Sequence, residues 1–138
     1  MKRYLLDTSL VAAFLHGRPV ILALLEPLVR DGQAGTSILV YGEVIEYLKG
    51  LPTFLEYRAR LQKLFELNQI IPYPLTYPIL ERYADIRRTL RPLHKEIGDI
   101  DTLIAATALE ENLTILTIDT DYERVPELKY ELVNLRAA

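Results

Sequence analysis

The segment Tyr4-Leu5-Leu6-Asp7-Thr8-Ser9 constrains the fold of this chain more than any other part of the sequence. Three apolar residues run into an aspartate and two hydroxyl residues, and a second apolar run, Leu10 to Leu15, follows. The pattern predicts a short buried strand, a carboxylate where the strand ends, and a helix that begins at once with Thr8 or Ser9 as its N-cap. Because ligands bind at the carboxyl ends of parallel strands, Asp7 is a candidate metal ligand.

The rest of the chain alternates strand-like and helical segments. Short apolar runs predict strands at 3–6, 34–36, 69–72, 114–117 and 130–135. Caps and three-to-four spacing predict helices at 8–15, 19–31, 38–49, 52–67, 76–90 and 98–112. Strands separated by helices predict a three-layer α/β/α fold around a central, mainly parallel sheet of four to five strands. Residues 1–138 are expected to form one domain.

Composition excludes several classes of site. The chain has no cysteine, which rules out disulfides, cysteine zinc sites and thiol catalysis. Its formal net charge of −3 provides no overall basic field, so any contact with nucleic acid must rest on a local patch. No apolar run is long enough to span a bilayer, and the lack of cysteine fits a cytoplasmic protein; we therefore expect a soluble cytoplasmic chain without a membrane partner.

Acidic residues interrupt the apolar pattern at a few positions. Asp7 and Asp119 follow predicted strands, Glu43 lies inside a mostly apolar helix, and Asp101 lies in the first turn of another; Asp99 and Asp121 are each two residues from one of these. Each has an ordinary alternative explanation, as a turn residue, a helix cap or a solvated helix position. Together, however, they are predicted to meet at one edge of a parallel sheet.

Several carboxylates in one pocket repel each other and ionise poorly unless a cation neutralises them. A ligand set made of oxygens alone selects a hard ion, Mg²⁺ or Mn²⁺. These ions suit phosphoryl chemistry. The sequence has no glycine-rich, lysine-terminated phosphate loop, so hydrolysis of a nucleoside triphosphate is not expected.

The chain resembles the PIN-domain ribonucleases, and within them the VapC-like toxins of type II toxin–antitoxin pairs. The resemblance rests on residues 4–9, on Thr36-Ser37 leading to Glu43, and on two longer segments, 99–106 and 116–126. It implies a Mg²⁺- or Mn²⁺-dependent endoribonuclease that acts on RNA, is inhibited by a cognate antitoxin, and forms a homodimer.

The resemblance also assigns site residues. The positions that match the catalytic, metal-binding acids of the family are Asp7, Glu43, Asp101 and Asp119. Asp121 matches an Asp-aromatic pair and competes with Asp119 for the fourth ligand position, a choice that the sequence leaves open. Thr8 and Thr117 fall where hydroxyls help to orient water or a carboxylate.

Two surfaces are candidates for partners. Basic residues precede Asp99 and could contact RNA phosphates, although a solvated helix face is an equal alternative; they are Arg87, Arg88, Arg91 and Lys95. The predicted helix pair within Ser37–Leu67 carries surplus apolar surface and is the candidate dimer interface or antitoxin groove.

Two other functions were weighed against the nuclease. A signalling receiver domain requires paired acids at the first strand and a lysine after a late strand, and the sequence has neither. A non-catalytic PIN-like module for RNA binding or assembly is the alternative that remains, and the presence of all four acids disfavours it.

Overall fold

A sheet of five parallel strands lies at the centre of the computed structural model, which describes residues 1–135. Its strand order is β3-β2-β1-β4-β5, and every neighbouring pair is parallel. The strands are β1 (Tyr4–Leu6), β2 (Ala34–Ser37), β3 (Ile71–Tyr73), β4 (Thr114–Thr117) and β5 (Tyr130–Leu132). The predicted parallel sheet is confirmed, and it has five strands where four to five were predicted.

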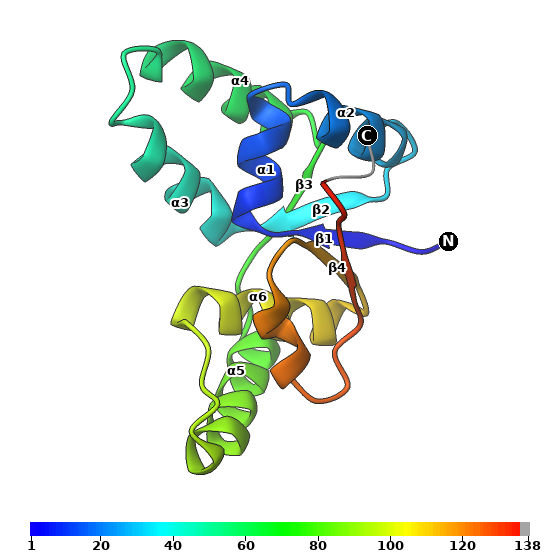
Figure 1. Cartoon of the computed structure of the whole chain (residues 1–138), viewed down its shortest axis with the longest axis vertical. Coiled ribbons are helices and arrows are strands. Elements are labelled where there is room, and N and C mark those ends of the chain that lie inside the picture. The colour runs from blue at the N-terminus through cyan, green and yellow to red at the C-terminus, as the bar shows by residue number, and fades with distance from the viewer. Residues whose placement is uncertain (136–138) are drawn as a thin grey trace.

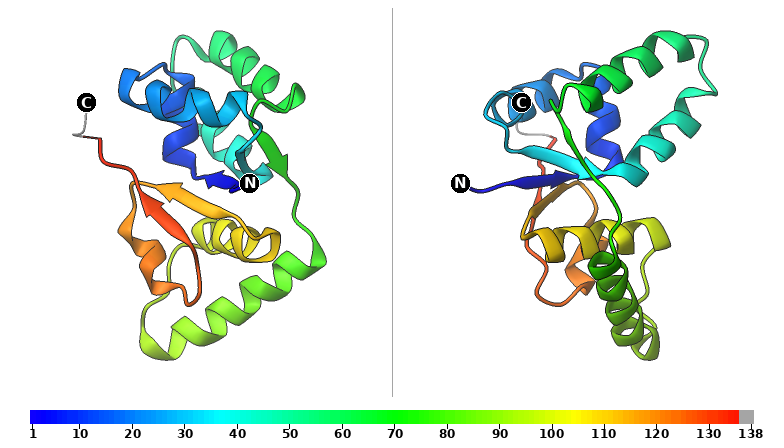
Figure 2. Two further views of the ribbon diagram at one scale, coloured as in Figure 1. Left: turned by 90° about the vertical axis from the view of Figure 1, so that its right-hand side faces the viewer. Right: turned by 180° about the vertical axis from the view of Figure 1, so that it is seen from behind.

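Helices cover both faces of this sheet (Figures 1 and 2). One layer contains α1 (Thr8–Leu15), α2 (Pro19–Arg30), α3 (Ile38–Leu48) and α4 (Phe54–Glu66). The other contains α5 (Tyr77–Leu90), α6 (Asp99–Glu111) and two short 3₁₀ helices, η1 (Arg91–Leu93) and η2 (Thr120–Arg124). The predicted three-layer α/β/α fold is therefore confirmed. The predicted domain continues to Ala138, and positions 136–138 lie outside the described residues.

Strand β1 is the middle strand, and its Leu5 and Leu6 have no exposed surface. Leu6 pairs in register with Thr36 of β2 and with Leu116 of β4. The residues one position further along, Asp7, Ser37 and Thr117, therefore lie level with one another at the same carboxyl edge. Helices α1 and α3 begin directly at that edge, while α6 precedes β4 and returns its first turn to the edge.

Local predictions were wrong at several element ends. The N-cap of α1 is Asp7, whose carboxylate accepts a hydrogen bond from the backbone N–H of Leu10, and not Thr8 or Ser9. Pro72 lies inside β3, which is tolerated because β3 is an edge strand. Strand β5 ends at Leu132, three residues earlier than predicted. By contrast, Ser37 caps α3 as the sequence predicts.

Helix length was also compared with the requirements of a membrane span. Within residues 1–135 no single helix is long and apolar enough to cross a bilayer. The pair α1 and α2 reaches the length and composition only together, across a bend of 102°.

A close approach of strands β2 and β3 generates a stability prediction. A Cβ on Gly35 of β2 would lie 2.5 Å from the ring of Tyr73 and 3.1 Å from the carbonyl oxygen of Ile71. Gly35→Ala should therefore destabilise the protein by about 1–3 kcal/mol, measured by urea unfolding. Gly42→Ala is the matched control, because that helical glycine has no atom within 4 Å of an added Cβ. The control should gain stability, and equal midpoints for the two variants would contradict the packing argument.

Candidate active site

Asp7 is a nearly buried carboxylate at the end of the central strand, with 6% of its surface exposed. One oxygen accepts the N–H of Leu10, which fixes the side chain as the cap of α1. The other oxygen accepts a short hydrogen bond from the hydroxyl of Thr117 at the end of β4. Both contacts stabilise the ionised form, while burial opposes it.

The hydroxyl of Thr117 connects Asp7 to the next acid in the chain. The same oxygen that donates to Asp7 accepts the backbone N–H of Asp119 at 2.9 Å. The carboxylate of Asp119 in turn caps η2 by accepting the N–H of Asp121 at 2.8 Å. Asp119 is thus held close to Asp7 by the turn that leaves β4.

Glu43 reaches the site from the second turn of α3. Its carboxylate accepts a short hydrogen bond from the hydroxyl of Thr8, the first residue of α1. This contact is available because Asp7, and not Thr8, caps α1. The side chain of Glu43 is half-buried, and its charge raises the pKa of Asp101 across the edge of the sheet.

Asp101 enters from the opposite helical layer, in the first turn of α6. Its carboxylate accepts a hydrogen bond of 3.2 Å from the hydroxyl of Tyr122 in η2. Tyr122 is 1% exposed, and burial together with the charge of Asp101 raises its pKa far above the ordinary value of a phenol. Its hydroxyl therefore stays protonated and remains a donor at every physiological pH.

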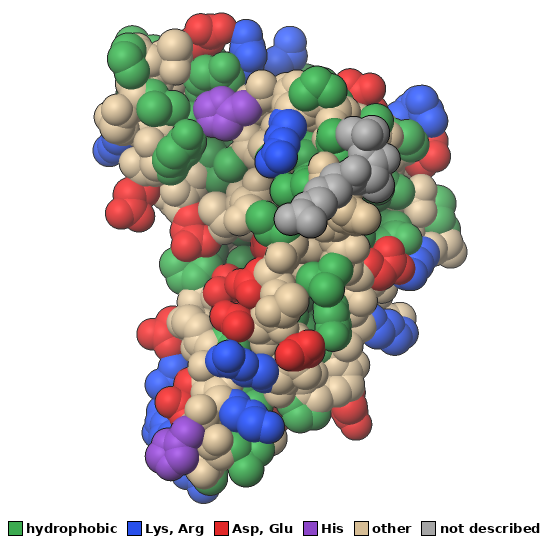
Figure 3. Space-filling model, viewed as in Figure 1, with side chains coloured by type: hydrophobic (Ala, Val, Ile, Leu, Met, Phe, Trp, Pro, Cys, Tyr) green, Lys and Arg blue, Asp and Glu red, His purple; other side chains and the backbone are tan. Residues whose placement is uncertain are grey.

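These acids interact electrostatically. Burial is the largest cause of the raised pKa of Asp7, and the charges of Asp101 and Asp119 raise it further. Burial likewise raises the pKa of Asp101, with contributions from Asp119, Glu43 and Asp121, while the Tyr122 hydrogen bond lowers it. Figure 3 shows acidic side chains gathered at the waist of the molecule, between the two helical layers.

A comparison with known protein families matches most of the chain. The PIN domain family matches residues 4–128. The chain belongs to the PIN domain family. It is 25% identical over 130 residues to ribonuclease VapC1 of Haemophilus influenzae, covering 93% of this chain and 96% of that protein. It is 40% identical over 88 residues to ribonuclease VapC of Rickettsia bellii, covering 61% of this chain and 58% of that protein.

Solved structures share the fold of this PIN domain. A crystal structure of VapBC2 from Rickettsia felis, bound to a DNA fragment from their promoter, matches with a TM-score of 0.82. The match has 22% sequence identity and covers 95% of this chain and 98% of that chain.

The donor set of this PIN domain fits a hard divalent cation. Its acids offer only oxygen ligands, and mutual repulsion already raises the pKa values of Asp7 and Asp101. Within residues 1–135 no three Asp, Glu or His side chains already converge closely enough to hold an ion. Hydroxyl groups hold three of the acids, namely Asp7, Glu43 and Asp101, so side-chain rotations would be required to bring the oxygens together.

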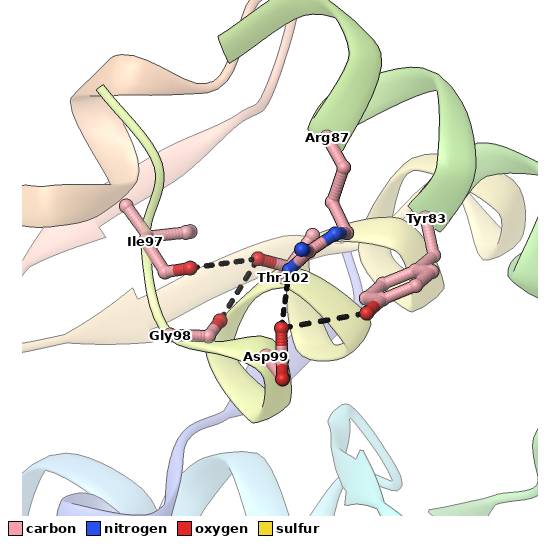
Figure 4. Close-up of polar contacts among 6 residues, drawn as sticks. All are labelled: Tyr83, Arg87, Ile97, Gly98, Asp99 and Thr102. Carbon is pink, nitrogen blue, oxygen red and sulfur yellow. Dashed lines mark hydrogen bonds and ion pairs between the residues drawn. The ribbon is translucent and has the colours of Figure 1, made fainter. Parts of the chain in front are cut away.

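Asp99 does not join the acids, although it is only two residues from Asp101. Its carboxylate forms a short ion pair with Arg87 of α5 and accepts a hydrogen bond of 3.4 Å from Tyr83 (Figure 4). Gly98 caps α6 without a side chain, and the hydroxyl of Thr102 bonds back to the carbonyl of Gly98 at 2.8 Å. Asp99 therefore anchors α6 to α5.

The basic residues predicted to contact RNA divide into two kinds. Arg87 is engaged by Asp99, so its guanidinium is not a free cation. Arg88, Arg91 and Lys95 are exposed, and no ion pair involves them within residues 1–135. The prediction that they bind RNA remains a proposal.

Sequence reasoning gave no role to two residues that contact the acids. Tyr122 donates to Asp101, and Arg124 forms an ion pair of 3.4 Å with Asp121. The only signal was their position directly after Asp119 and Asp121, where a turn at the sheet edge brings side chains back over the strand ends.

The buried charge of Asp7 generates a prediction about stability and pH. Its pKa is raised in the folded protein, so the unfolded chain loses this proton at lower pH than the folded chain. Ionisation therefore destabilises the fold once the pH rises through the folded pKa, and the cost is absent below the unfolded pKa. Asp7→Asn, which keeps an N-capping side chain, should raise stability in EDTA at pH 7 by about 0.5–2 kcal/mol.

Thermal unfolding between pH 3 and pH 8 tests this prediction. The stability gained by Asp7→Asn should vanish near pH 3. Asp85→Asn, at an exposed position, should give no comparable gain in stability at any pH in this range. A gain from Asp7→Asn that is independent of pH would contradict the electrostatic cause.

The Tyr122 hydrogen bond generates a second prediction. Tyr122→Phe removes one donor, so the pKa of Asp101 should rise further, and stability should fall by about 1 kcal/mol. Carboxyl ¹³C NMR titration of the metal-free protein measures the pKa directly. Tyr83→Phe, which removes the donor to Asp99 instead, is the control. An unchanged Asp101 titration in Tyr122→Phe would refute the assigned contact.

Proposed function

We propose that this PIN domain is a Mg²⁺- or Mn²⁺-dependent endoribonuclease that hydrolyses RNA phosphodiester bonds, and that it is the toxin of a toxin–antitoxin pair. The observation that carries the proposal is the placement of Asp7, Asp101 and Asp119 at one sheet edge, where Thr117 links Asp7 to Asp119 and Tyr122 of the adjoining η2 holds Asp101. Its PIN-family membership and the relatives named ribonuclease VapC support the same reaction class.

In the proposed site Asp7, Glu43, Asp101 and Asp119 hold the cation. Asp119 is the better fourth ligand than Asp121 because the Thr117 hydroxyl links it directly to Asp7 and its charge raises the pKa of both Asp7 and Asp101. Asp121 pairs instead with Arg124 at 3.4 Å, which partly neutralises its charge. Asp121 is then a neighbouring charge that raises the pKa of Asp101 without binding the ion.

The chain's hydroxyl groups orient the acids in this proposal. Thr117 holds Asp7, Thr8 holds Glu43 and Tyr122 holds Asp101, each through one carboxylate oxygen. Within residues 1–135 the second oxygen of Glu43 and of Asp101 is left for the ion, whereas the second oxygen of Asp7 also accepts the N–H of Leu10 and would bind the ion through its remaining lone pair. When bound, Mg²⁺ or Mn²⁺ would supply polarisation of the phosphodiester and a lowered pKa for the attacking water. The acids also position that water for in-line attack.

Assembly and location belong to the same proposal. The cognate antitoxin is the expected protein partner, by analogy with toxin–antitoxin relatives. Exposed apolar side chains on α3 and α4 support the helix pair as a homodimer or antitoxin surface; they are Ile38, Tyr47 and Leu55. We further propose that residues 1–138 form a single domain that acts in the cytoplasm without a membrane partner.

Loss of one ligand tests the reaction. Asp101→Asn should lower RNA cleavage by purified protein at least about 100-fold, since electrostatic stabilisation of this kind contributes several kcal/mol. Asp85→Asn, an exposed acid on α5, should cleave at the parent rate. Circular dichroism confirms folding. Undiminished cleavage by Asp101→Asn would remove the site from the mechanism.

Titration calorimetry with Mn²⁺ separates the nuclease from a non-catalytic PIN-like module. The parent should bind Mn²⁺ near neutral pH, and Asp101→Asn should bind it more weakly. A parent protein without Mn²⁺ affinity would favour the module.

A further inference from the structure

A groove beside the acids is lined by basic residues that the proposed mechanism does not use. Its volume is about 590 Å³, and its lining residues are His94, Lys95, Glu123 and Arg124. One wall is the turn that follows η1, and the other is the end of η2. Figure 3 shows Lys and Arg side chains close to the acidic patch on the lower layer.

The backbone of this groove is well fixed. The N–H of His94 bonds to the carbonyl of Arg91 at 3.0 Å, and the N–H of Lys95 bonds to the carbonyl of Leu90 at 3.1 Å. Arg124 joins the two walls by donating to the carbonyl of Glu96 at 3.3 Å. The cationic groups are therefore presented by a rigid frame, while their side chains stay exposed to solvent.

Arg124 also connects the groove to the acids. Its guanidinium lies 3.4 Å from Asp121, and the backbone N–H of Asp121 bonds to Asp119 at 2.8 Å. The ion pair is weak because both side chains are more than 40% exposed. A phosphate would offer the guanidinium a bidentate, charge-assisted contact, so exchanging Asp121 for a phosphate costs little.

Lys95 provides a second cation in this groove. Its exposed ammonium takes part in no ion pair within residues 1–135. Among the described residues that line the groove, one acid, Glu123, faces the two cations Lys95 and Arg124. In a chain with a net charge of −3, this is a local basic site directly beside an acidic one.

We propose that this groove binds a backbone phosphate of the RNA strand next to the scissile phosphodiester, with Arg124 and Lys95 as its ligands. The inference rests on the proposed function, because the acids define where the scissile bond lies. Contacts of this kind fix the position of the strand and add affinity without reading the base sequence. Arg124 and Lys95 thus position the substrate and are not assigned to the chemical step.

RNA binding in EDTA tests the groove separately from cleavage. Affinity for a labelled single-stranded RNA is measured by fluorescence anisotropy over a range of salt, in the Asp101→Asn background. The double variant Lys95→Ala/Arg124→Gln should bind about tenfold more weakly or worse. The slope of log affinity against log salt should fall by about 0.7 for each lost contact.

Matched controls exist on the other helical layer. Lys49→Ala replaces an exposed lysine after α3, and Arg30→Gln removes an exposed arginine that also pairs with a neighbouring aspartate, at 3.6 Å. Both should leave affinity and slope unchanged. Circular dichroism and thermal unfolding verify that every variant folds.

Each result decides the proposal. Equal affinity and slope in the double variant and its background would overturn it, as would a background protein that does not bind RNA. In the otherwise unchanged chain with metal, the double variant should raise KM more than it lowers kcat. If Asp101→Asn cleaves normally, the proposed function fails, but a binding loss confined to the double variant would still establish a phosphate site.

Discussion

Burial of the Asp7 carboxylate at the end of the central strand is the constraint on which the site depends. A carboxylate with so little exposed surface carries a desolvation cost, and the like charges of Asp101 and Asp119 add to it. Two donors, the Thr117 hydroxyl and the Leu10 N–H, offset part of that cost. An uncharged capping side chain at this position would avoid the desolvation cost, so the ionised carboxylate lowers the stability of the fold.

Hydroxyl groups recur around the acids, and each comes from a different element. Thr8 belongs to α1, Thr117 ends β4, and Tyr122 lies in η2. A hydroxyl orients a carboxylate and leaves its charge in place. A lysine or arginine in the same position would neutralise that charge. The site therefore stays acidic while its side chains are held in place. The guanidinium of Arg124 instead pairs with Asp121, which lies outside the proposed ligand set.

Sequence patterns predicted the sheet well because it depends on local, strongly patterned segments. Residues 4–9 encode a buried strand that ends in an acid, and parallel pairing then places Asp7 level with Thr117. The patterns could not identify which side chain caps α1, because Asp7, Thr8 and Ser9 are all good N-caps. Nor could they show that Arg87 pairs with Asp99 or that the Tyr122 hydroxyl reaches Asp101. These contacts depend on the tertiary packing of α5, α6 and η2.

The acids are supplied by both helical layers as well as by the sheet. Glu43 and Thr8 come from the α1–α4 layer, and Asp101 and Tyr122 come from the layer of α6 and η2. The site is complete only while both layers are docked on the strands. Partial opening of either layer requires less free energy than global unfolding. It would separate the acids from one another while most of the sheet remains intact. Loss of catalysis on warming would then precede loss of secondary structure. Catalytic activity would therefore indicate whether both helical layers are packed on the sheet.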